Sequence, residues 1–318
     1  MGAAIETQDL TKDFLVGFWR PRPYRALDAL TLSVEPGEVF GFLGPNGAGK
    51  STTLKLLMQL IYPTSGESRI LGRPVGDVAV RQRIGYLAEN PYFYDYLTAE
   101  EVLTYFARLF GIRGKDATAR VATVLDEVGI GAERRMRLRQ FSKGMLQRVG
   151  LGQAIINDPE VVFLDEPMSG LDPLGRRQVR DLILRLRAKG TTVFFSSHIL
   201  SDAETLCSRV AILAQGRLAA TGRISEMVAF QLKGWELVVS GVSDELHAAL
   251  AGKVAELRPL SHGRYTIRIA PDDKPERLMT ELSSRGASVE SLQPVRDTLE
   301  DYFVQQVTAA KGRDTGGL

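Results

Sequence analysis

The segment Gly44-Pro45-Asn46-Gly47-Ala48-Gly49-Lys50-Ser51 constrains the fold of this chain more than any other. It fits the pattern G-x-x-x-x-G-K-[ST], which needs a buried strand before it and a helix after it. Both flanks are present, because residues 39–43 read as a short apolar strand and residues 52–60 carry leucines at helical spacing. The sequence therefore predicts a strand, a glycine-rich loop and a helix in that order.

This loop has the chemistry of a phosphate-binding site. Its glycines let backbone N–H groups turn toward an anion without Cβ clashes, and the start of the next helix adds a partial positive charge. We expect Lys50 to reach the β- and γ-phosphates of a nucleotide and Ser51 to offer a hydroxyl to Mg²⁺. The alternative, a chance glycine-rich turn, is disfavoured by the Lys-Ser pair between a strand and a helix. Residues 44–52, which end at Thr52, are therefore predicted to bind a nucleotide.

The composition excludes several classes of protein. The chain has 318 residues, enough for one large domain and a smaller one. Its 40 basic and 38 acidic residues nearly balance, so no general attraction to nucleic acid is expected. Cys207 is the only cysteine, which leaves no partner for an intrachain disulfide. Residues 1–10 lack the apolar core of a signal peptide, and no apolar run approaches the roughly 18 residues of a membrane span. If the protein works at a membrane, we expect another chain to cross it.

Apolar spacing and turn signals predict an α/β domain. Residues 5–43 read as strands with a turn at Pro36-Gly37, interrupted by an insertion at 17–25 that reads as an exposed loop. Residues 98–156 read as helical, and strands then alternate with helices, which implies a parallel sheet with helices on its faces. The expected helices are one from Thr98 that Gly111 closes, one at about 116–128 and one at about 144–156, followed by strand, helix, strand, helix and strand at 160–164, 174–189, 191–196, 200–207 and 209–213.

The character of the sequence changes after Lys233-Gly234. The later segments are predicted in the order βαββαβ, which is typical of a small α+β, ferredoxin-like domain. We expect a nucleotide-binding domain at 1–231, with a helical subdomain at about 90–157, and an accessory domain at 232–318. The accessory elements are expected at 236–240 (strand), 244–251 (helix), 254–257 and 265–269 (a hairpin around His262-Gly263), 274–285 (helix), 289–292 (strand) and 298–310 (helix).

Two carboxylates follow a second apolar strand at 161–164. In a parallel sheet, that end of the strand faces the ligand crevice. We expect Asp165 to hold Mg²⁺, through water, and Glu166 to orient and deprotonate an attacking water molecule. An isolated Asp-Glu pair is usually part of a solvated loop, but a phosphate loop earlier in the same chain favours the catalytic interpretation.

A second helix start suited to phosphate lies at Phe141-Ser142-Lys143-Gly144-Met145, where Ser142 is placed to cap the helix at 144–156. With the phosphate loop and the Asp165-Glu166 strand, this segment resembles the ATP-binding cassette (ABC) family. The family signature is Leu-Ser-Gly-Gly-Gln, so the second and fourth positions match. Lys and Met at the third and fifth occur in some exporter branches. The resemblance covers residues 5 to about 230 and implies a P-loop NTPase fold of ABC type, with Ser142, Lys143 and Gly144 at the nucleotide.

Further cassette motifs follow in order. Ser169-Gly170-Leu171-Asp172-Pro173 resembles the family's D-loop, with Asp172 as its acid. His198, after the strand at 191–196, resembles the switch histidine that contacts the γ-phosphate. Without the resemblance, a histidine at this place would more often be a capping or surface residue.

Phe14 matches the aromatic residue that stacks on adenine in the family. Face stacking needs only a flat ring, so it gives affinity with little base selectivity. Trp19 and Tyr24 in the inserted segment compete for this role, and a core phenylalanine is the alternative for Phe14.

Glu89, in Gly85-Tyr86-Leu87-Ala88-Glu89-Asn90-Pro91, stands where the family usually has glutamine. That glutamine reaches Mg²⁺ and the attacking water, and its loop contacts the membrane subunit. An ionised glutamate can still bind Mg²⁺ through oxygen, but it cannot donate a hydrogen bond. We therefore expect Glu89 at the metal site, with a solvated loop acid as the alternative.

The resemblance implies an ATPase subunit of an ABC transporter, an exporter, that works with ATP and Mg²⁺. Two copies would bind head to tail, with ATP on Lys50 of one subunit covered by Ser142 and Gly144 of the other. Hydrolysis would open the dimer and drive a separate permease, which places the chain at the cytoplasmic face of the cell membrane as a peripheral protein. Residues 297–303 resemble the closing segment of many stand-alone exporter ATPases.

Two other functions remain open at this point. A non-transport cassette ATPase would act on ribosomes or DNA, but such proteins carry paired cassettes, long coiled-coil inserts or basic arms. The basic run at 134–139 is short and reads as a solvated helix face. An ATP-binding regulator without turnover would leave Glu166 idle.

Overall fold

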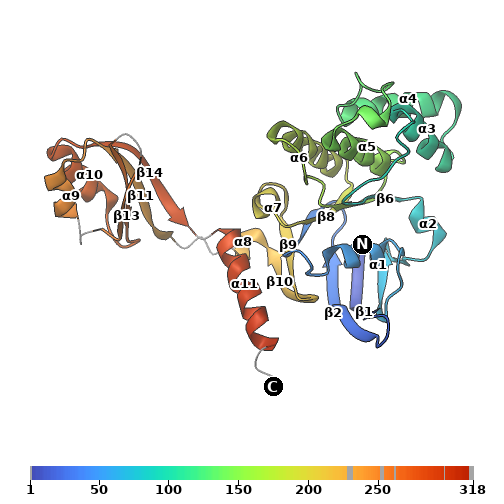
Figure 1. The fold of residues 1–318 in the computed structure, drawn as a ribbon, viewed down its shortest axis with the longest axis horizontal. Coiled ribbons are helices and arrows are strands. Elements are labelled where there is room, and N and C mark those ends of the chain that lie inside the picture. Colours follow the sequence, from blue (N-terminus) through green and yellow to red (C-terminus); the bar gives the residue numbers. More distant parts are fainter. Residues whose placement is uncertain (1, 228–231, 251–253, 261–262, 297, 315–318) are drawn as a thin grey trace. The chain divides into compact units, whose positions relative to one another are not determined.

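The chain divides into two compact units in the computed structural model, which describes residues 2–227, 232–250, 254–260, 263–296 and 298–314 (Figure 1). The first unit runs to Ile224 and includes the chain from Phe303, and the second spans Ser225–Tyr302. The boundary expected from the sequence, between residues 231 and 232, lies a few residues after Ile224 and stays a prediction. Among the described residues, the first unit contains two sheets and the second contains one, and each unit has its own apolar core.

The first unit is built on a six-stranded, mainly parallel sheet in the order β10-β9-β3-β8-β7-β6. Parallel pairing puts Leu43 beside Ser197 and Asp165 beside Ser196, so β3, β7 and β8 end at the same edge. The loops that leave these strands therefore emerge side by side. The strands are β3 (Val39–Leu43), β6 (Ile84–Leu87), β7 (Val161–Asp165), β8 (Thr192–Ser197), β9 (Arg209–Ala214) and the antiparallel β10 (Arg217–Arg223).

A second, antiparallel sheet has the order β2-β1-β4-β5. Its strands are β1 (Ile5–Val16), β2 (Arg22–Val34), β4 (Ser65–Ile70) and β5 (Arg73–Pro74). The expected loop at 17–25 is wrong in its second half, because Arg22 to Arg25 pair with the end of β1. Cross-strand hydrogen bonding extends the hairpin, although these residues are exposed and show no apolar alternation. The short strands β4, β5 and β6 were not predicted.

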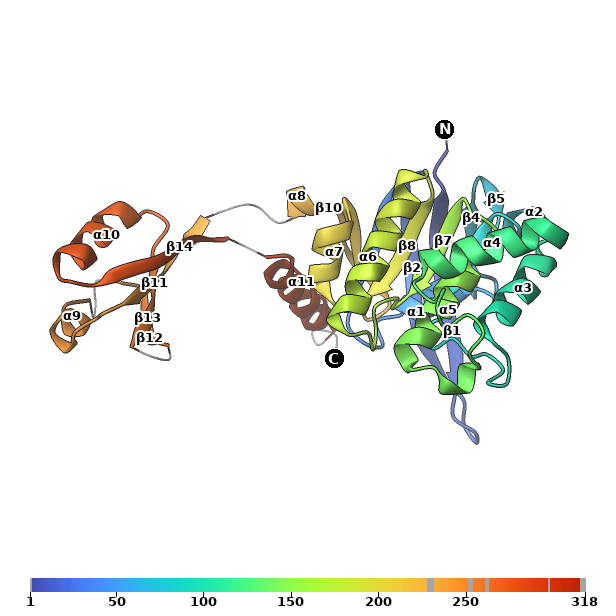
Figure 2. The ribbon, with the colours of Figure 1, turned by 90° about the horizontal axis from the view of Figure 1, so that it is seen from above.

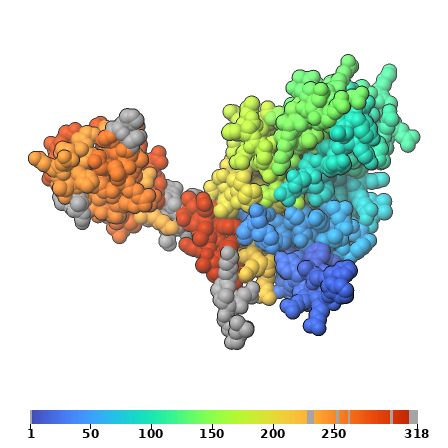
Figure 3. Space-filling view, viewed as in Figure 1, coloured from blue at the N-terminus to red at the C-terminus, as the bar shows by residue number. Residues whose placement is uncertain are grey.

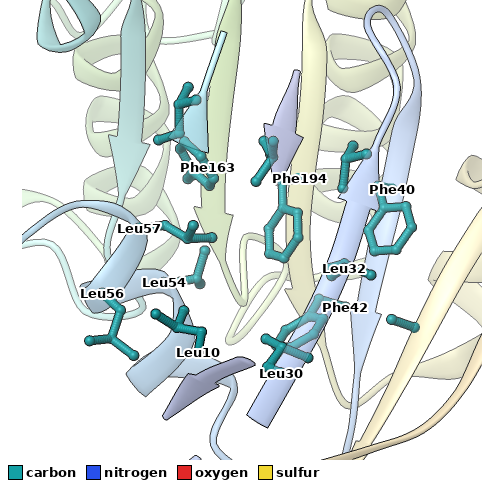
Figure 4. Close-up of a cluster of buried hydrophobic side chains, with 14 of the residues drawn as sticks. Leu10, Leu30, Leu32, Phe40, Phe42, Leu54, Leu56, Leu57, Phe163 and Phe194 are labelled. Carbon is teal, nitrogen blue, oxygen red and sulfur yellow. The ribbon is translucent and has the colours of Figure 1, made fainter. Parts of the chain in front are cut away.

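The core of the first unit lies between the two sheets and includes one face of α1 (Lys50–Leu57) (Figure 4). Phe194 of β8 packs against Phe40 and Phe42 of β3 and Phe163 of β7, with ring centroids 5.2–5.8 Å apart. All are essentially buried, and full burial of such a side chain stabilises by roughly 1.5–3 kcal/mol. This packing fixes the strands whose ends carry the site residues.

Three helices cover the other face of the parallel sheet: α5 (Lys143–Ile155), α6 (Pro173–Ala188) and α7 (Leu200–Leu206) (Figure 1). α5 also packs against α3 (Ala99–Leu109) and α4 (Gly114–Glu127), and these helices form a separate lobe on the surface of the unit (cyan to green in Figure 3). The expected start of a helix at Thr98 is confirmed, because Thr98 caps α3 in a capping box with Glu101. A short helix α2 (Val78–Arg81) precedes β6, and α8 (Ile224–Met227) follows β10.

Two local expectations are wrong. α1 ends at Leu57, because Gln59 adopts a left-handed conformation (φ 54°), so Leu60 lies outside the helix and is 60% exposed. The basic run at 134–139 is not a helix face. It contains turns and the start of the 3₁₀ helix η1 (Leu138–Gln140), where Leu138 is buried, and Arg134 pairs with Glu100.

The second unit has the expected βαββαβ element order, in an antiparallel sheet with the order β12-β13-β11-β14. Its core includes Leu237, Val239 and Ile267 of the sheet and Leu246 and Leu282 of the two helices. Ala251 and His262, which were expected to end a helix and to form a hairpin turn, lie outside the described residues. The elements are β11 (Leu232–Ser240), α9 (Asp244–Leu250), β12 (Glu256–Pro259), β13 (Arg264–Ile269), α10 (Pro275–Ser284) and β14 (Ser288–Arg296). The next helix, α11 (Leu299–Asp314), belongs to the first unit from Phe303 onward.

Membrane-spanning helices are not found in the described part of the chain: none of its helices is both long enough and apolar enough.

We predict that Gly85→Ala destabilises the first unit strongly. Gly85 is buried in β6, and a Cβ there would overlap the carbonyl oxygen of Ala154 in α5, which is backbone and cannot rotate away. Overpacking of this kind costs about 1–3 kcal/mol or more. Urea unfolding should show the loss. Gly76→Ala is the matched control, because its Cβ would meet only the far end of the Gln59 side chain, which can rotate away. Equal midpoints for the two variants would contradict this packing.

Candidate nucleotide-binding site

A cavity of about 510 Å³ opens where β3, β7 and β8 end. Its volume is within the usual range for small-molecule sites. The residues that line it come from the phosphate loop, the base of the β1–β2 hairpin and the loops after β6, β7 and β8: Phe14, Tyr24, Ala26, Asn46, Gly47, Gly49, Lys50, Ser51, Thr52, Glu89, Glu166, Ser169 and His198.

The phosphate loop has the backbone shape that its glycines allow. Gly47 and Gly49 have φ values of 78° and 106°, in the left-handed region that other residues rarely adopt. A Cβ on Gly49 would also lie 2.6 Å from the carbonyl oxygen of Ala26. α1 begins directly after the loop at Lys50, so free N–H groups and the positive end of the helix face the cavity. Gly44, Pro45 and Ala48 shape the loop but are not among the lining residues.

Lys50 is buried beneath the loop, with only 6% of the residue exposed. Its Nζ donates a hydrogen bond to the carbonyl oxygen of Gly44 at 2.7 Å and lies 3.3 Å from Oε1 of Glu166. The ammonium group and the carboxylate thus compensate each other where a phosphate would enter.

Glu166 is held in position by several neighbours. It has a φ of 49°, and its N–H donates to Oγ of Ser196 at 3.0 Å. Ser196 in turn donates to Oδ1 of Asp165 at 2.6 Å, and Nδ1 of His198 lies 2.8 Å from Oε2 of Glu166. The structure therefore brings the two expected catalytic residues, Glu166 and His198, into direct contact. Asp165 is 98% buried behind them and does not line the cavity.

Ser196 was missed by sequence reasoning, although it is fully buried and bonded to both carboxylate residues. The only signal would have been the parallel pairing of β7 with β8, which places it beside Asp165.

Of the aromatic candidates, Phe14 and Tyr24 line the cavity and Trp19 does not. Phe14 and Tyr24 are directly opposite each other on β1 and β2, so their side chains share one face of the hairpin. Phe14 is half-buried outside the apolar core, and the ammonium of Lys12 lies 5.1 Å from its ring centroid. Both rings therefore border the cavity in which a base would stack.

The side chains expected to hold a magnesium ion, those of Ser51, Asp165 and Glu89, all carry oxygen atoms, and Ser51 and Glu89 line the cavity. Burial, then the charges of Asp165 and Glu89, raise the pKa of Tyr86 to about 12, so a neutral phenol lies among these acids. Hydroxyl and carboxylate oxygens are ligands that Mg²⁺ accepts, together with phosphate oxygens and water. In the described ranges no group of three or more His, Cys, Asp and Glu side chains could hold a metal by itself.

The remaining candidates, Ser142, Lys143, Gly144 and Asp172, lie outside the cavity of their own chain. Ser142 is exposed, and its Oγ accepts a hydrogen bond from the N–H of Met145 at the start of α5. Asp172 caps α6 in the same way, through the N–H of Gly175. A Cβ on Gly170 would lie 3.2 Å from the side chain of Lys143, so the two segments are neighbours.

Comparison with known proteins finds relatives that are ABC transporter ATP-binding proteins. The family model for ABC transporters matches residues 27–169. An uncharacterized ABC transporter ATP-binding protein of Synechocystis sp. is 45% identical over 305 residues, which cover 95% of this chain and 84% of the relative. The bacitracin transport ATP-binding protein BcrA of Bacillus licheniformis is 35% identical and is covered to 98%, with 96% of this chain.

The solved structures that resemble this chain include ATP-binding proteins of the same family. The ATP-binding subunit of an ABC transporter is similar with a TM-score of 0.62 and 32% identity, over 70% of this chain and 91% of that one. A dimeric bacterial ABC transporter cassette, MJ0796, is similar with a TM-score of 0.63 and 25% identity, over 69% and 98% of the two chains. The chain therefore belongs to the family of ABC transporter ATP-binding proteins, the subunits that bind and hydrolyse ATP.

Proposed function

We propose that this protein powers an exporter, by closing a head-to-tail dimer around two ATP molecules and opening it after hydrolysis. The observation that carries the proposal is the division of the site. The cavity of one chain holds Lys50, Glu166 and His198, whereas the exposed helix start at Ser142 lies outside it. A second copy is the natural source of the missing helix start, because one nucleotide would then touch both segments.

The residues of the cavity suggest how each contributes. A triphosphate would draw Lys50 toward its β- and γ-phosphates and away from Glu166, which now lies 3.3 Å away. Glu166 would then accept a proton from water as the water oxygen bonds to the γ-phosphorus and the bond to the ADP oxygen breaks. Nδ1 of His198 holds the carboxylate in place. Mg²⁺, held by Ser51, Asp165 and Glu89, would offset the charge of the phosphates.

A surface beside Glu89 supports docking to a separate permease. Tyr92, Tyr94 and Tyr105 are 89%, 63% and 59% exposed, and together with Leu97 and Phe106 they border a cavity of about 240 Å³. Gathered exposed aromatic side chains mark protein interfaces more often than free surface. The loop that carries Glu89 leads directly into this group, so a permease bound here would contact the residues next to the nucleotide. This would place the chain at the cytoplasmic face of the membrane.

The proposed direction of transport, export, and the proposed class of cargo are based on what relatives transport. BcrA is a bacitracin transport ATP-binding protein, and a relative in Escherichia coli is a probable multidrug ABC transporter ATP-binding protein, 35% identical over 71% of this chain. The signature variant at 141–145, Glu89 and the second unit favour the same group. An ATPase acting on ribosomes or DNA would instead show ATP hydrolysis stimulated by nucleic acid.

We predict that Glu166→Gln lowers the rate of ATP hydrolysis by about 10²–10⁴-fold, because glutamine cannot accept the proton. ATP affinity should persist, since the phosphate loop is unchanged. Light scattering after size exclusion should show a dimer of this variant with ATP and a monomer with ADP. Glu35→Gln, in an exposed turn before β3, is the control and should behave as the parent. Equal hydrolysis rates for parent and Glu166→Gln, or a monomer at saturating ATP, would contradict the proposal.

We predict that Ser142→Ala reduces both ATP-dependent dimerisation and turnover. The variant also loses a helix cap, which costs about 1 kcal/mol, so the stability loss must be separated from the loss of function. Thr98→Ala is the matched control, because it removes the cap of α3 outside the proposed dimer contact. Urea unfolding should show similar losses for both variants, and only Ser142→Ala should lose ATPase activity. Equal activity losses would remove the support for a shared site.

We predict that Tyr94→Ser combined with Tyr105→Ser weakens binding to the permease without changing ATP hydrolysis by the isolated chain. Purification of the tagged full chain from detergent-extracted membranes, with partners identified by mass spectrometry, measures this. A multispanning membrane protein should co-purify with the parent and be depleted with the double variant. Tyr62→Ser, another exposed tyrosine, is the control. Ribosomal proteins as the main partners would favour the non-transport alternative.

A further inference from the structure

The tip of the β1–β2 hairpin exposes large apolar side chains that the ATPase mechanism does not use. Phe18 and Trp19 are 91% and 89% exposed, and their rings meet edge to face with centroids 5.6 Å apart. Leu15 and Val16 on the adjoining strand are also exposed. In Figure 2 this hairpin projects beyond the rest of the first unit (dark blue, bottom). Two neighbouring aromatic rings in open solvent contribute nothing to the core, and such a pair is typical of a surface that binds another molecule or a membrane.

The tip is distinct from the nucleotide cavity. Phe14 and Tyr24 form the pair at the base of the hairpin and line the cavity, whereas none of the residues 15–23 does. The next pairs outward, Leu15 with Pro23 and Val16 with Arg22, continue the ladder in register. The aromatic tip is therefore carried on an ordered hairpin.

The tip is also positively charged. Residues 15–23 contain Arg20 and Arg22 and no acidic residue. Neither arginine has an ion-pair partner within the part of the chain that the structure describes, whereas Arg25 at the base is paired with Asp13 at 2.9 Å and Asp28 at 3.0 Å. Two arginines without an ion-pair partner among the described residues thus follow directly after two exposed aromatic rings.

We propose that this tip binds the surface of an anionic lipid bilayer. Tryptophan and phenylalanine rings settle at the boundary between headgroups and acyl chains, and arginines are attracted to anionic headgroups. Pro21 and Pro23 have no N–H groups, so the backbone here brings fewer donors that a lipid environment would leave unsatisfied. The proposal rests on the proposed function in one respect, because a permease partner would bring this unit beside a membrane.

Nucleic acid fits the same observations less well. A binding surface for nucleic acid neutralises many phosphates along a stripe or groove. Here the uncompensated cations sit on a single projecting tip, and the chain as a whole has 40 basic against 38 acidic residues.

The test uses the purified full chain without any permease. The sequence has two tryptophans, Trp19 and Trp235, so Trp235→Phe leaves Trp19 as the only indole reporter. Vesicles of phosphatidylglycerol should shift the Trp19 emission to the blue and pellet the protein on centrifugation. Phosphatidylcholine vesicles should bind at least fivefold more weakly, and added salt should weaken binding to the anionic vesicles.

In the same background, Phe18→Ser combined with Arg20→Gln should lower vesicle binding at least tenfold while ATP hydrolysis in solution stays at the parent rate. Tyr62→Ser combined with Arg113→Gln is the matched control, because it removes an exposed aromatic ring and an exposed arginine elsewhere in the same unit. Absence of a blue shift, equal binding to both lipids, or a stronger response to single-stranded DNA than to vesicles would overturn the proposal. A failure of the Glu166→Gln or Ser142→Ala predictions would count against the proposed function and would leave the vesicle result standing.

Discussion

The site depends on the parallel register of β3, β8 and β7. Hydrogen bonding between these strands brings Leu43, Ser197 and Asp165 to one edge of the sheet, and buried phenylalanines that pack against one another hold the strands together. The phosphate loop, Glu166 and His198 each begin where one of these strands ends. Their proximity is therefore a property of the sheet, and a change that shifted one strand would separate residues that we propose act on the same phosphate.

Ser196 shows how the strand register positions the side chains of the site. Its hydroxyl accepts from the N–H of Glu166 and donates to Asp165, so one buried side chain fixes the backbone of the proposed base and the orientation of a proposed metal ligand. Such a fully bonded buried group rigidifies the site. The Glu166 carboxylate in turn contacts Lys50 and His198.

The sequence alone was sufficient to predict features that depend on residues close together in the chain. The phosphate loop, the apolar strand before Asp165 and the cap at Thr98 each depend on neighbours in sequence. Ser196 could not be found this way, because its partner Asp165 is 31 positions away and only strand pairing joins them. The extension of β2 to Arg22 was missed for the same reason, since pairing with β1 rather than burial makes it a strand. The end of α1 before Leu60 depends on a single left-handed residue that periodicity does not reveal. Whether Phe14 or Tyr24 meets the base is likewise undetermined by pattern, because both line the cavity.

The ion pair between Lys50 and Glu166 has a further consequence for how the nucleotide enters. A lone ammonium group at this depth would be costly to desolvate, but the fold already supplies its counter-charge. The free-energy cost of burying the Lys50 ammonium group is thus offset during folding, before any ligand binds. If ATP binds as we propose, its phosphate would exchange places with Glu166 as the anionic partner of Lys50. The pocket would then be preorganised for its ligand, and Glu166, the proposed base, would stay paired until that ligand arrives.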